Sequence, residues 1–176
     1  ASAMVESMRA HGYTLSTAVA DIVDNSIAAN CSNVWLRFEW DENASWVSVT
    51  DDGAGMSEAE LRSAMRLGSQ SPVEERDVDD LGRFGLGLKT ASFSQARRLT
   101  VFSRAEGGQD ALRRWDLDHL ANPEVKGWQL LKTAHPETGD RIHELNRKEL
   151  GSGTQVLIEV LDRVVGSAPV TGSSRT

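Results

Sequence analysis

The spacing of hydrophobic positions along this 176-residue chain changes between the period of a helix and the period of a strand. From residue 15 to residue 30 the apolar side chains recur at about 3.6-residue intervals, which predicts a helix with one apolar face. A shorter helix is expected over residues 3–11, and Gly12 ends it. The apolar face of the longer helix consists of Leu15, Val19, Ile22, Val23 and Ile27.

Alternating apolar and polar residues predict the first strand at Val34, Leu36 and Phe38. A second strand over residues 46–50 leads into an Asp-Asp-Gly sequence that marks a turn or loop. Further strands are expected at residues 99–103 and near residues 111–117, 127–132 and 154–161.

Ser57 and Glu60 form a capping box, which predicts a helix from this point to about Met65. Residues 68–82 lack apolar periodicity and form a long loop, whereas residues 85–95 have a helical pattern. Because helices and strands come in blocks, we expect an α+β fold with a mixed sheet and helices on one face.

Composition limits the classes of protein to which the chain can belong. With 26 acidic and 19 basic residues the formal net charge is −7, which argues against a surface devoted to nucleic-acid phosphates. No apolar run approaches the roughly 20 residues that a membrane span needs, so we expect no membrane association. The single cysteine, Cys31, excludes an intrachain disulfide and fits a reducing, cytoplasmic compartment.

The length suits one domain, which we place at residues 1–165. Residues 166–176 are small and polar, as in a flexible linker or tail. We therefore expect the chain to be one module of a longer protein, with further domains beyond its C-terminus. Any contact with nucleic acid is expected to come from those domains.

Short polar side chains gather on one side of the helix over residues 15–30. Asp21, Asp24, Asn25 and Ala28 lie within about 100° of one another around the helix axis. Short carboxylates and an amide beside small residues can hold a hard cation such as Mg²⁺. The alternative is an ordinary solvated helix face.

Residues 51–56, Asp-Asp-Gly-Ala-Gly-Met, lie between a strand and a capped helix. A turn explains the first Asp-Gly pair, but it explains the second glycine and the methionine less well. A carboxylate at the end of a strand can accept a hydrogen bond from an exocyclic amine, and glycines let the backbone approach a flat ligand.

Residues 82–90, Gly-Arg-Phe-Gly-Leu-Gly-Leu-Lys-Thr, match neither the dinucleotide fingerprint nor the P-loop. They join a loop to a helix, so free N–H groups at the helix start can hold phosphate oxygens, with Lys89 nearby. A simple helix-entry turn is the alternative. The Gly153-Thr154 pair, which opens the last apolar strand, is uninformative by itself.

Taken together and in this order, these motifs are specific enough to suggest a protein family. The order is Asp-x-x-Asp-Asn on a helix, Asp-x-Gly-x-Gly after a strand, Gly-x-x-Gly-x-Gly before a helix, and a late Gly-Thr. This order, over roughly residues 4–163, resembles the GHKL ATPase superfamily of gyrase B subunits, ninety-kilodalton heat-shock chaperones, histidine kinases and MutL. The residues within these motifs are most similar to those of the Microrchidia-like and chaperone-like branches. The resemblance implies the Bergerat ATP-binding fold, a two-layer sandwich of a mixed sheet covered by helices.

The resemblance also implies roles for single residues. Asn25 would coordinate Mg²⁺, Asp52 would accept from the adenine amine, and Gly55 would shape the adenine pocket. Met56 would pack on the adenine ring, and Thr154 would support adenine through a water. Residues 68–81 would form a lid over ATP or ADP. The phosphates would contact Gly82, Gly85, Leu86, Gly87, Leu88, Lys89 and Thr90.

Two positions depart from the pattern of the superfamily. Hydrolysing members carry Glu as the general base where this chain has Asp21, and many relatives carry an acid at Ala28. Aspartate is shorter by one methylene, and a displacement of about 1 Å can cost about 10²-fold in rate. A lysine from a following transducer domain also completes the site in gyrase-like and MutL-like proteins.

The resemblance therefore implies Mg²⁺-dependent ATP binding with slow hydrolysis. Closure of the lid would drive homodimerisation or coupling to a following domain. A nucleotide-binding switch that does not hydrolyse is the alternative. The catalytic domain of a histidine kinase is a further one, although the acid at Asp21 argues against it.

Overall fold

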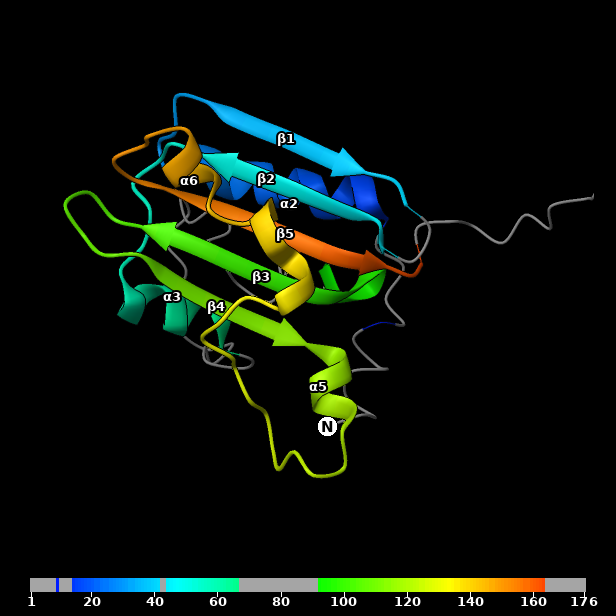
Figure 1. Ribbon diagram of the computed structural model, residues 1–176. Helices are drawn as coiled ribbons and strands as arrows, with labels where there is room; N and C mark the ends of the chain where they lie inside the picture. Colours follow the sequence, from blue (N-terminus) through cyan, green and yellow to red (C-terminus); the bar gives the residue numbers. More distant parts are fainter. Residues whose placement is uncertain (1–8, 10–13, 42–43, 67–91, 164–176) are drawn as a thin grey trace, which may run out of the picture.

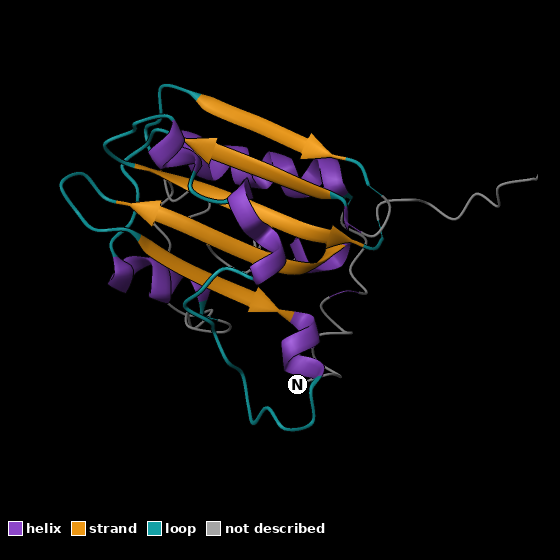
Figure 2. Ribbon diagram, viewed as in Figure 1, coloured by secondary structure: helices purple, strands orange, loops and turns teal. Residues whose placement is uncertain are grey.

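A computed structural model describes residue 9 and residues 14–41, 44–66 and 92–163. In these residues the chain forms a five-stranded sheet with helices, which confirms the α+β class (Figures 1 and 2). No helix in this part of the chain has the length and apolarity to cross a membrane. The elements are α2 (Leu15–Ala28), β1 (Val34–Glu39), β2 (Trp46–Asp51), α3 (Glu58–Met65), β3 (Ala96–Arg104), β4 (Ala111–Asp116), α5 (Leu117–Ala121), η2 (Pro136–Arg141), α6 (Glu144–Arg147) and β5 (Gly153–Leu161).

The strand order is β1-β2-β5-β3-β4, and every neighbouring pair is antiparallel. The sequence predicted a mixed sheet, and for the five described strands this is wrong. Alternation of side chains is the same in both strand directions, so it cannot reveal direction. Here short connections join β1 to β2 and β3 to β4, and β5 returns between the two hairpins.

Most strand predictions are confirmed with small shifts at their ends, but residues 127–132 do not form a strand. The β-pairing of this segment with β4 is one isolated bridge, between Arg114 and Leu131. The capping box of α3 is confirmed, since Ser57 and Glu60 bond each other's backbone. Residues 92–95 are helical, whereas the rest of the predicted helix 85–95 lies outside the described residues. The same holds for the predicted helix 3–11 except residue 9, for the loop 68–82 and for the tail 166–176.

Helices α2 and α3 cover one face of the sheet and enclose the larger core. On this face Leu99 and Val101 of β3 pack with Ile158 of β5, Ile22 of α2 and Leu61 of α3. Each of these side chains is at most 2% exposed, and burial of one such side chain stabilises the fold by roughly 1.5–3 kcal/mol.

The orientation of α2 differs from the prediction. Ile27, expected on the apolar face, is 62% exposed, whereas Asn25, expected opposite that face, is buried. The reason is polar: the Ser26 hydroxyl donates to the carboxylate of Asp51 over 2.8 Å, which turns this side of the helix toward β2. The buried side chains of α2 are Ala18, Ile22, Asn25 and Ser26.

The opposite face of the sheet is covered by η2 and α6, which lie in front of it in Figure 1. Trp46, Phe102 and Leu157 of the strands pack there against Ile142 and Leu145. The sequence predicted helices on one face only. These two helices have six and four residues, too short to produce a visible helical period.

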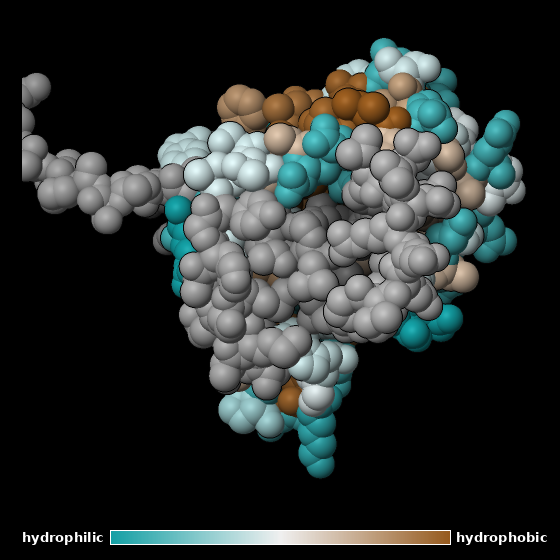
Figure 3. All heavy atoms as spheres, turned by 180° about the vertical axis from the view of Figure 1, so that it is seen from behind, coloured by the Kyte–Doolittle hydropathy of each residue, from teal (hydrophilic) through white to brown (hydrophobic). Residues whose placement is uncertain are grey.

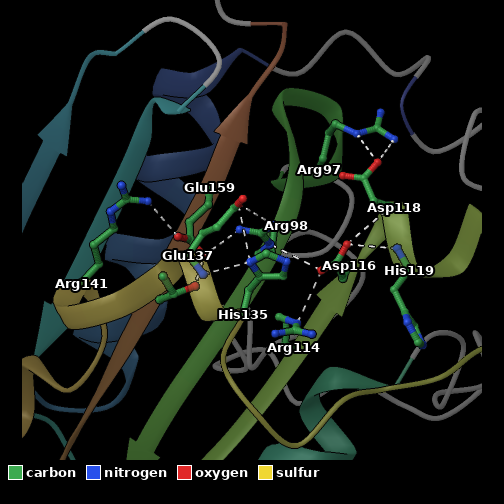
Figure 4. Close-up of polar contacts among 11 residues, drawn as sticks. Arg97, Arg98, Arg114, Asp116, Asp118, His119, His135, Glu137, Arg141 and Glu159 are labelled. Carbon is green, nitrogen blue, oxygen red and sulfur yellow. Dashed lines mark hydrogen bonds and ion pairs between the residues drawn. The ribbon is translucent and has the colours of Figure 1, made fainter.

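Beside this smaller core, charged side chains are buried in a connected group, which Figure 4 shows. Asp116 lies 3.4 Å from Arg98 and 3.6 Å from Arg114. Glu159 accepts from Thr138 and Arg141 over 2.8 Å and 3.2 Å. Burial lowers the pKa of Arg114, and the charge of Asp116 opposes this effect. Each charge here is stable because an opposite charge is buried beside it.

This arrangement makes Asp116 more important for stability than the nearby Asp118. Asp116→Ala removes the buried carboxylate that lies 3.6 Å from Arg114 and should lower the free energy of unfolding by about 3–5 kcal/mol. Asp118 is 60% exposed and pairs with Arg97, so Asp118→Ala should cost about 1 kcal/mol or less. Urea denaturation of both variants measures the difference. Equal losses would contradict the assignment.

Candidate functional site

Asp51, the last residue of β2, is a buried carboxylate held by three parts of the fold. Its Oδ1 accepts from the backbone N–H of Gly53 (2.9 Å) and of Thr154 (3.2 Å). Its Oδ2 accepts from the Ser26 hydroxyl on α2 (2.8 Å). The orientation of the Asp51 side chain is therefore determined jointly by α2, the loop after β2 and the start of β5.

Burial raises the pKa of Asp51 above its usual range, and its hydrogen bonds offset this only in part. A carboxylate offers about four lone-pair positions. In the part of the chain that the structure describes, three donors use three of them. Asp51 can therefore accept one further hydrogen bond, and in this surrounding such a donor would be favoured.

A chain of polar contacts continues from Asp51 toward β3. The Thr154 and Ser103 hydroxyl oxygens are 2.8 Å apart. Ser103 accepts from the backbone N–H of Met56 over 2.8 Å and donates to the carbonyl of Gly153 over 3.0 Å. Either of the two hydroxyls can donate in the contact between Ser103 and Thr154. Met56 is buried in the core.

The loop after β2 needs its glycines because other backbone segments lie against it. Gly55 has a φ of +64°, and a Cβ there would lie 1.8 Å from the carbonyl oxygen of Arg104. A Cβ on Gly53 would lie 2.8 Å from the carbonyl oxygen of Ala29. These glycines thus allow α2, β3 and the loop to come together around Asp51.

Asp52, to which the resemblance assigned the adenine amine, is bonded to the connection between α2 and β1. Its Oδ1 accepts from the N–H groups of Ser32 and Asn33, both over 2.7 Å, and its Oδ2 accepts from the Asn33 amide over 2.8 Å. These bonds, that of the Asn33 side chain first, lower the pKa of Asp52. Asp52 is partly exposed and ties β2 to the connection between α2 and β1.

Sequence reasoning passed over Asp51, although two features of the sequence indicate it. The Asp-x-Gly-x-Gly motif, counted from its first residue, begins at Asp51 and continues to Gly53 and Gly55. The alternation of β2 also puts Asp51 on the same face as Val47 and Val49, which is the core face. The side chain of Asp52, the next residue, points to the opposite face.

Asn25 and Asp21 lie one turn apart on α2. Asn25 is buried next to Ser26, and Asp21 is half-buried. Asp24 and Ala28, which the sequence grouped with them, are exposed. The polar group predicted on one helix face is thus divided between the interior and the solvent.

Among the described residues no group of three or more His, Cys, Asp or Glu side chains could hold a metal ion. A single amide oxygen, such as that of Asn25, fits Mg²⁺ only when phosphate oxygens and waters supply the other ligands. The remaining predicted contacts lie outside the described residues, namely the lid 68–81 and Gly82, Gly85, Leu86, Gly87, Leu88, Lys89 and Thr90.

Comparisons with known proteins identify relatives that match part of this chain. ATPase morc-1 of Caenorhabditis elegans is 27% identical over 86% of this chain and 19% of its own length. The chaperone protein HtpG of Bacillus velezensis is 32% identical over 51% of this chain and 16% of its own length. The DNA mismatch repair protein MutL of Rhodospirillum rubrum is 33% identical over 54% of this chain and 15% of its own length. The chain thus covers less than a fifth of the length of each of these relatives.

A family model described as histidine kinase-, DNA gyrase B- and HSP90-like ATPase matches residues 13–152. This match includes α2, all strands except β5, and the loop that holds Asp51. The chain therefore belongs to the family of histidine kinase-, DNA gyrase B- and HSP90-like ATPases, the GHKL superfamily.

Proposed function

We propose that this chain is a Mg²⁺-dependent ATP-binding module and that Asp51 accepts the hydrogen bond of the adenine amine. The observation that carries the proposal is a buried carboxylate whose three donors among the described residues leave one acceptor position. An exocyclic amine can supply the missing donor. Because Asp51 is fixed from three sides, it presents that acceptor without having to reorganise.

Asp52 does not suit this role, although the resemblance first suggested it. Asp52 has three described donors, as Asp51 has, but they come from Ser32 and Asn33, and Asp52 is partly exposed at the other side of β2. Turning it toward adenine would break all three hydrogen bonds. The assignment to Asp51 also agrees with the spacing of the superfamily motif.

The surroundings of Asp51 support the other adenine contacts. Thr154 follows Gly153 at the start of β5 and lies opposite Asp51 in the register. Its hydroxyl can donate and accept, which suits a water that bridges to the purine. Gly55 and Met56 bring the loop after β2 to the same place, where Met56 could pack on the ring.

Hydrolysis is the less direct part of the proposal. Asp21, one turn before Asn25, is the acid that α2 offers as a general base for the attacking water. Its short side chain favours slow turnover, and it also favours a second candidate function, a switch that binds ATP and does not hydrolyse it. We further propose that lid closure over residues 68–81 couples binding to homodimerisation or to a following domain.

The two neighbouring carboxylates provide a matched test of the adenine contact. Asp51→Asn should weaken ATP binding by about tenfold to a hundredfold, the loss expected for a hydrogen bond to a charged group. Asp52→Asn should leave ATP affinity within about twofold, because that carboxylate contacts Ser32 and Asn33. Isothermal titration calorimetry measures both, with circular dichroism as the control for folding.

Inosine triphosphate sharpens this test because it carries an oxygen in place of the adenine amine. The wild type should bind it weakly, and Asp51→Asn should reduce the preference for ATP because an amide can donate to that oxygen. Loss of binding in Asp52→Asn with normal binding in Asp51→Asn would overturn the assignment.

The role of Asp21 as general base is tested by measuring ATP turnover in variants that still bind ATP. Asp21→Ala should leave ATP affinity unchanged and lower phosphate release by about 10²-fold or more, as for a lost general base. Asp21→Glu should raise the rate, since it restores the longer acid of the hydrolysing relatives. Asp24→Ala, an exposed neighbour on the same helix, is the control. Unchanged turnover in Asp21→Ala would exclude Asp21 as the base.

Removal of Mg²⁺ tests the phosphate side of the site. Addition of EDTA should weaken ATP binding sharply, because the chain carries a net charge of −7 and must bind an anionic ligand. In Asn25→Ala, affinity with Mg²⁺ should already be low, and EDTA should change it little. Calorimetry reports this without any measurement of activity. An equal response to EDTA in the variant and the wild type would exclude Asn25 as a ligand.

A further inference from the structure

A group of large apolar side chains is exposed at the β1 edge of the sheet. The exposed fractions are 62% for Ile27, 48% for Leu36, 74% for Phe38 and 57% for Trp40. Figure 3 shows the resulting hydrophobic area along the upper margin, at the height where Figure 1 places β1 in front of α2. Leu36, Phe38 and Trp40 follow one another at the two-residue period of one strand face. Apolar groups gathered in this way mark an interaction surface.

The backbone at this edge is open as well. β1 pairs with β2 on one side and has no described strand on the other. Asn33 accepts from the N–H of Asp52, so the odd-numbered residues of β1 direct their main-chain groups toward β2. The N–H and C=O groups of Leu36 and Phe38 therefore point outward, where they can bond another strand.

The edge lacks the features that usually prevent strand pairing. Within β1 there is no proline and no lysine, and its register with β2 has no bulge. Arg37, a charged residue of the strand, points to the opposite face, where it contacts Glu144 and lies 5.7 Å from the Trp46 ring. It leaves the apolar side of the edge uncovered.

We propose that β1 pairs antiparallel with β1 of a second copy of this chain, centred on Phe38. In this register each Phe38 lies opposite Phe38 of the other copy, and each Leu36 lies opposite Trp40. Arg37 then lies opposite Glu39 twice, so that both charged pairs are complementary. One sheet continues through both copies, and the contact is isologous, as twofold symmetry requires.

Other registers fit less well. Centring the pair on Arg37 would put two arginines opposite each other, which destabilises a strand pair. Centring it on Leu36 would put Arg37 opposite Trp35 and leave the charges unmatched. A shift by one residue would turn the apolar face of one copy to the polar face of the other. Charge and apolar pattern thus select the same centre.

This contact does not depend on the nucleotide site. Asp51 lies opposite Val34 at the start of β1, whereas Phe38 lies near its other end. Pairing of the two strands uses main-chain groups and side chains of the edge alone. The dimer is therefore expected in the absence of ATP, and Asp51→Asn should form it as the wild type does.

Disulfide trapping tests the register, in a Cys31→Ser background that removes the native cysteine. In Phe38→Cys the two Cα atoms would be about 5.5 Å apart, within the range of a disulfide. In Leu36→Cys the equivalent atoms would be about 13 Å apart along the strands, too far for one. Mild oxidation should therefore give covalent dimers of Phe38→Cys and not of Leu36→Cys. Equal crosslinking of the two variants, or none in Phe38→Cys, would overturn the register.

Sedimentation equilibrium of the chain without nucleotide tests the association itself. Glu39→Lys would put Lys opposite Arg37 and should weaken the dimer by at least about tenfold. Glu106→Lys, the same charge change at an exposed position of the β3–β4 hairpin, should leave the dimer unchanged. A wild type that stays monomeric at all concentrations would refute the proposal. So would equal effects of the two variants.

Discussion

One buried carboxylate, that of Asp51, is the interaction on which the arrangement of the site depends. A buried charge is costly unless donors compensate it, so the fold must bring N–H and O–H groups to this point. It does so from three directions, with Ser26 of α2, Gly53 of the following loop and Thr154 of β5. The orientation of α2, the close approach of the loop and the start of β5 all follow from satisfying this one side chain.

The same requirement explains why adjacent acids have opposite properties. Asp51 points to the core face, where burial raises its pKa, and Asp52 points away, where hydrogen bonds lower its pKa. A similar balance operates on the other face of the sheet, where Asp116 and Glu159 are buried with arginines. Buried charge thus organises both faces of the sheet.

The family relationship and the geometry of the site bear on different questions. The match to the family model establishes the superfamily, and the Asp51 environment is the basis of the proposed adenine contact. The β1 edge adds a feature of this chain that the site does not use. Its apolar side chains and outward main-chain groups lie at the far end of the strand from Asp51, so nucleotide binding and strand pairing can be separated experimentally.

The sequence by itself determined the class of fold, most elements and the superfamily, because these depend on periodicity, capping residues and motif order. Strand direction and the rotation of α2 were decided only by the tertiary structure. Side-chain period is blind to strand direction, and a helix with polar and apolar residues on neighbouring faces has no unique inner side. Partners distant in sequence, such as Ser26 and Asp51, settle that choice, since hydrogen bonding of a buried carboxylate outweighs burial of one isoleucine, Ile27.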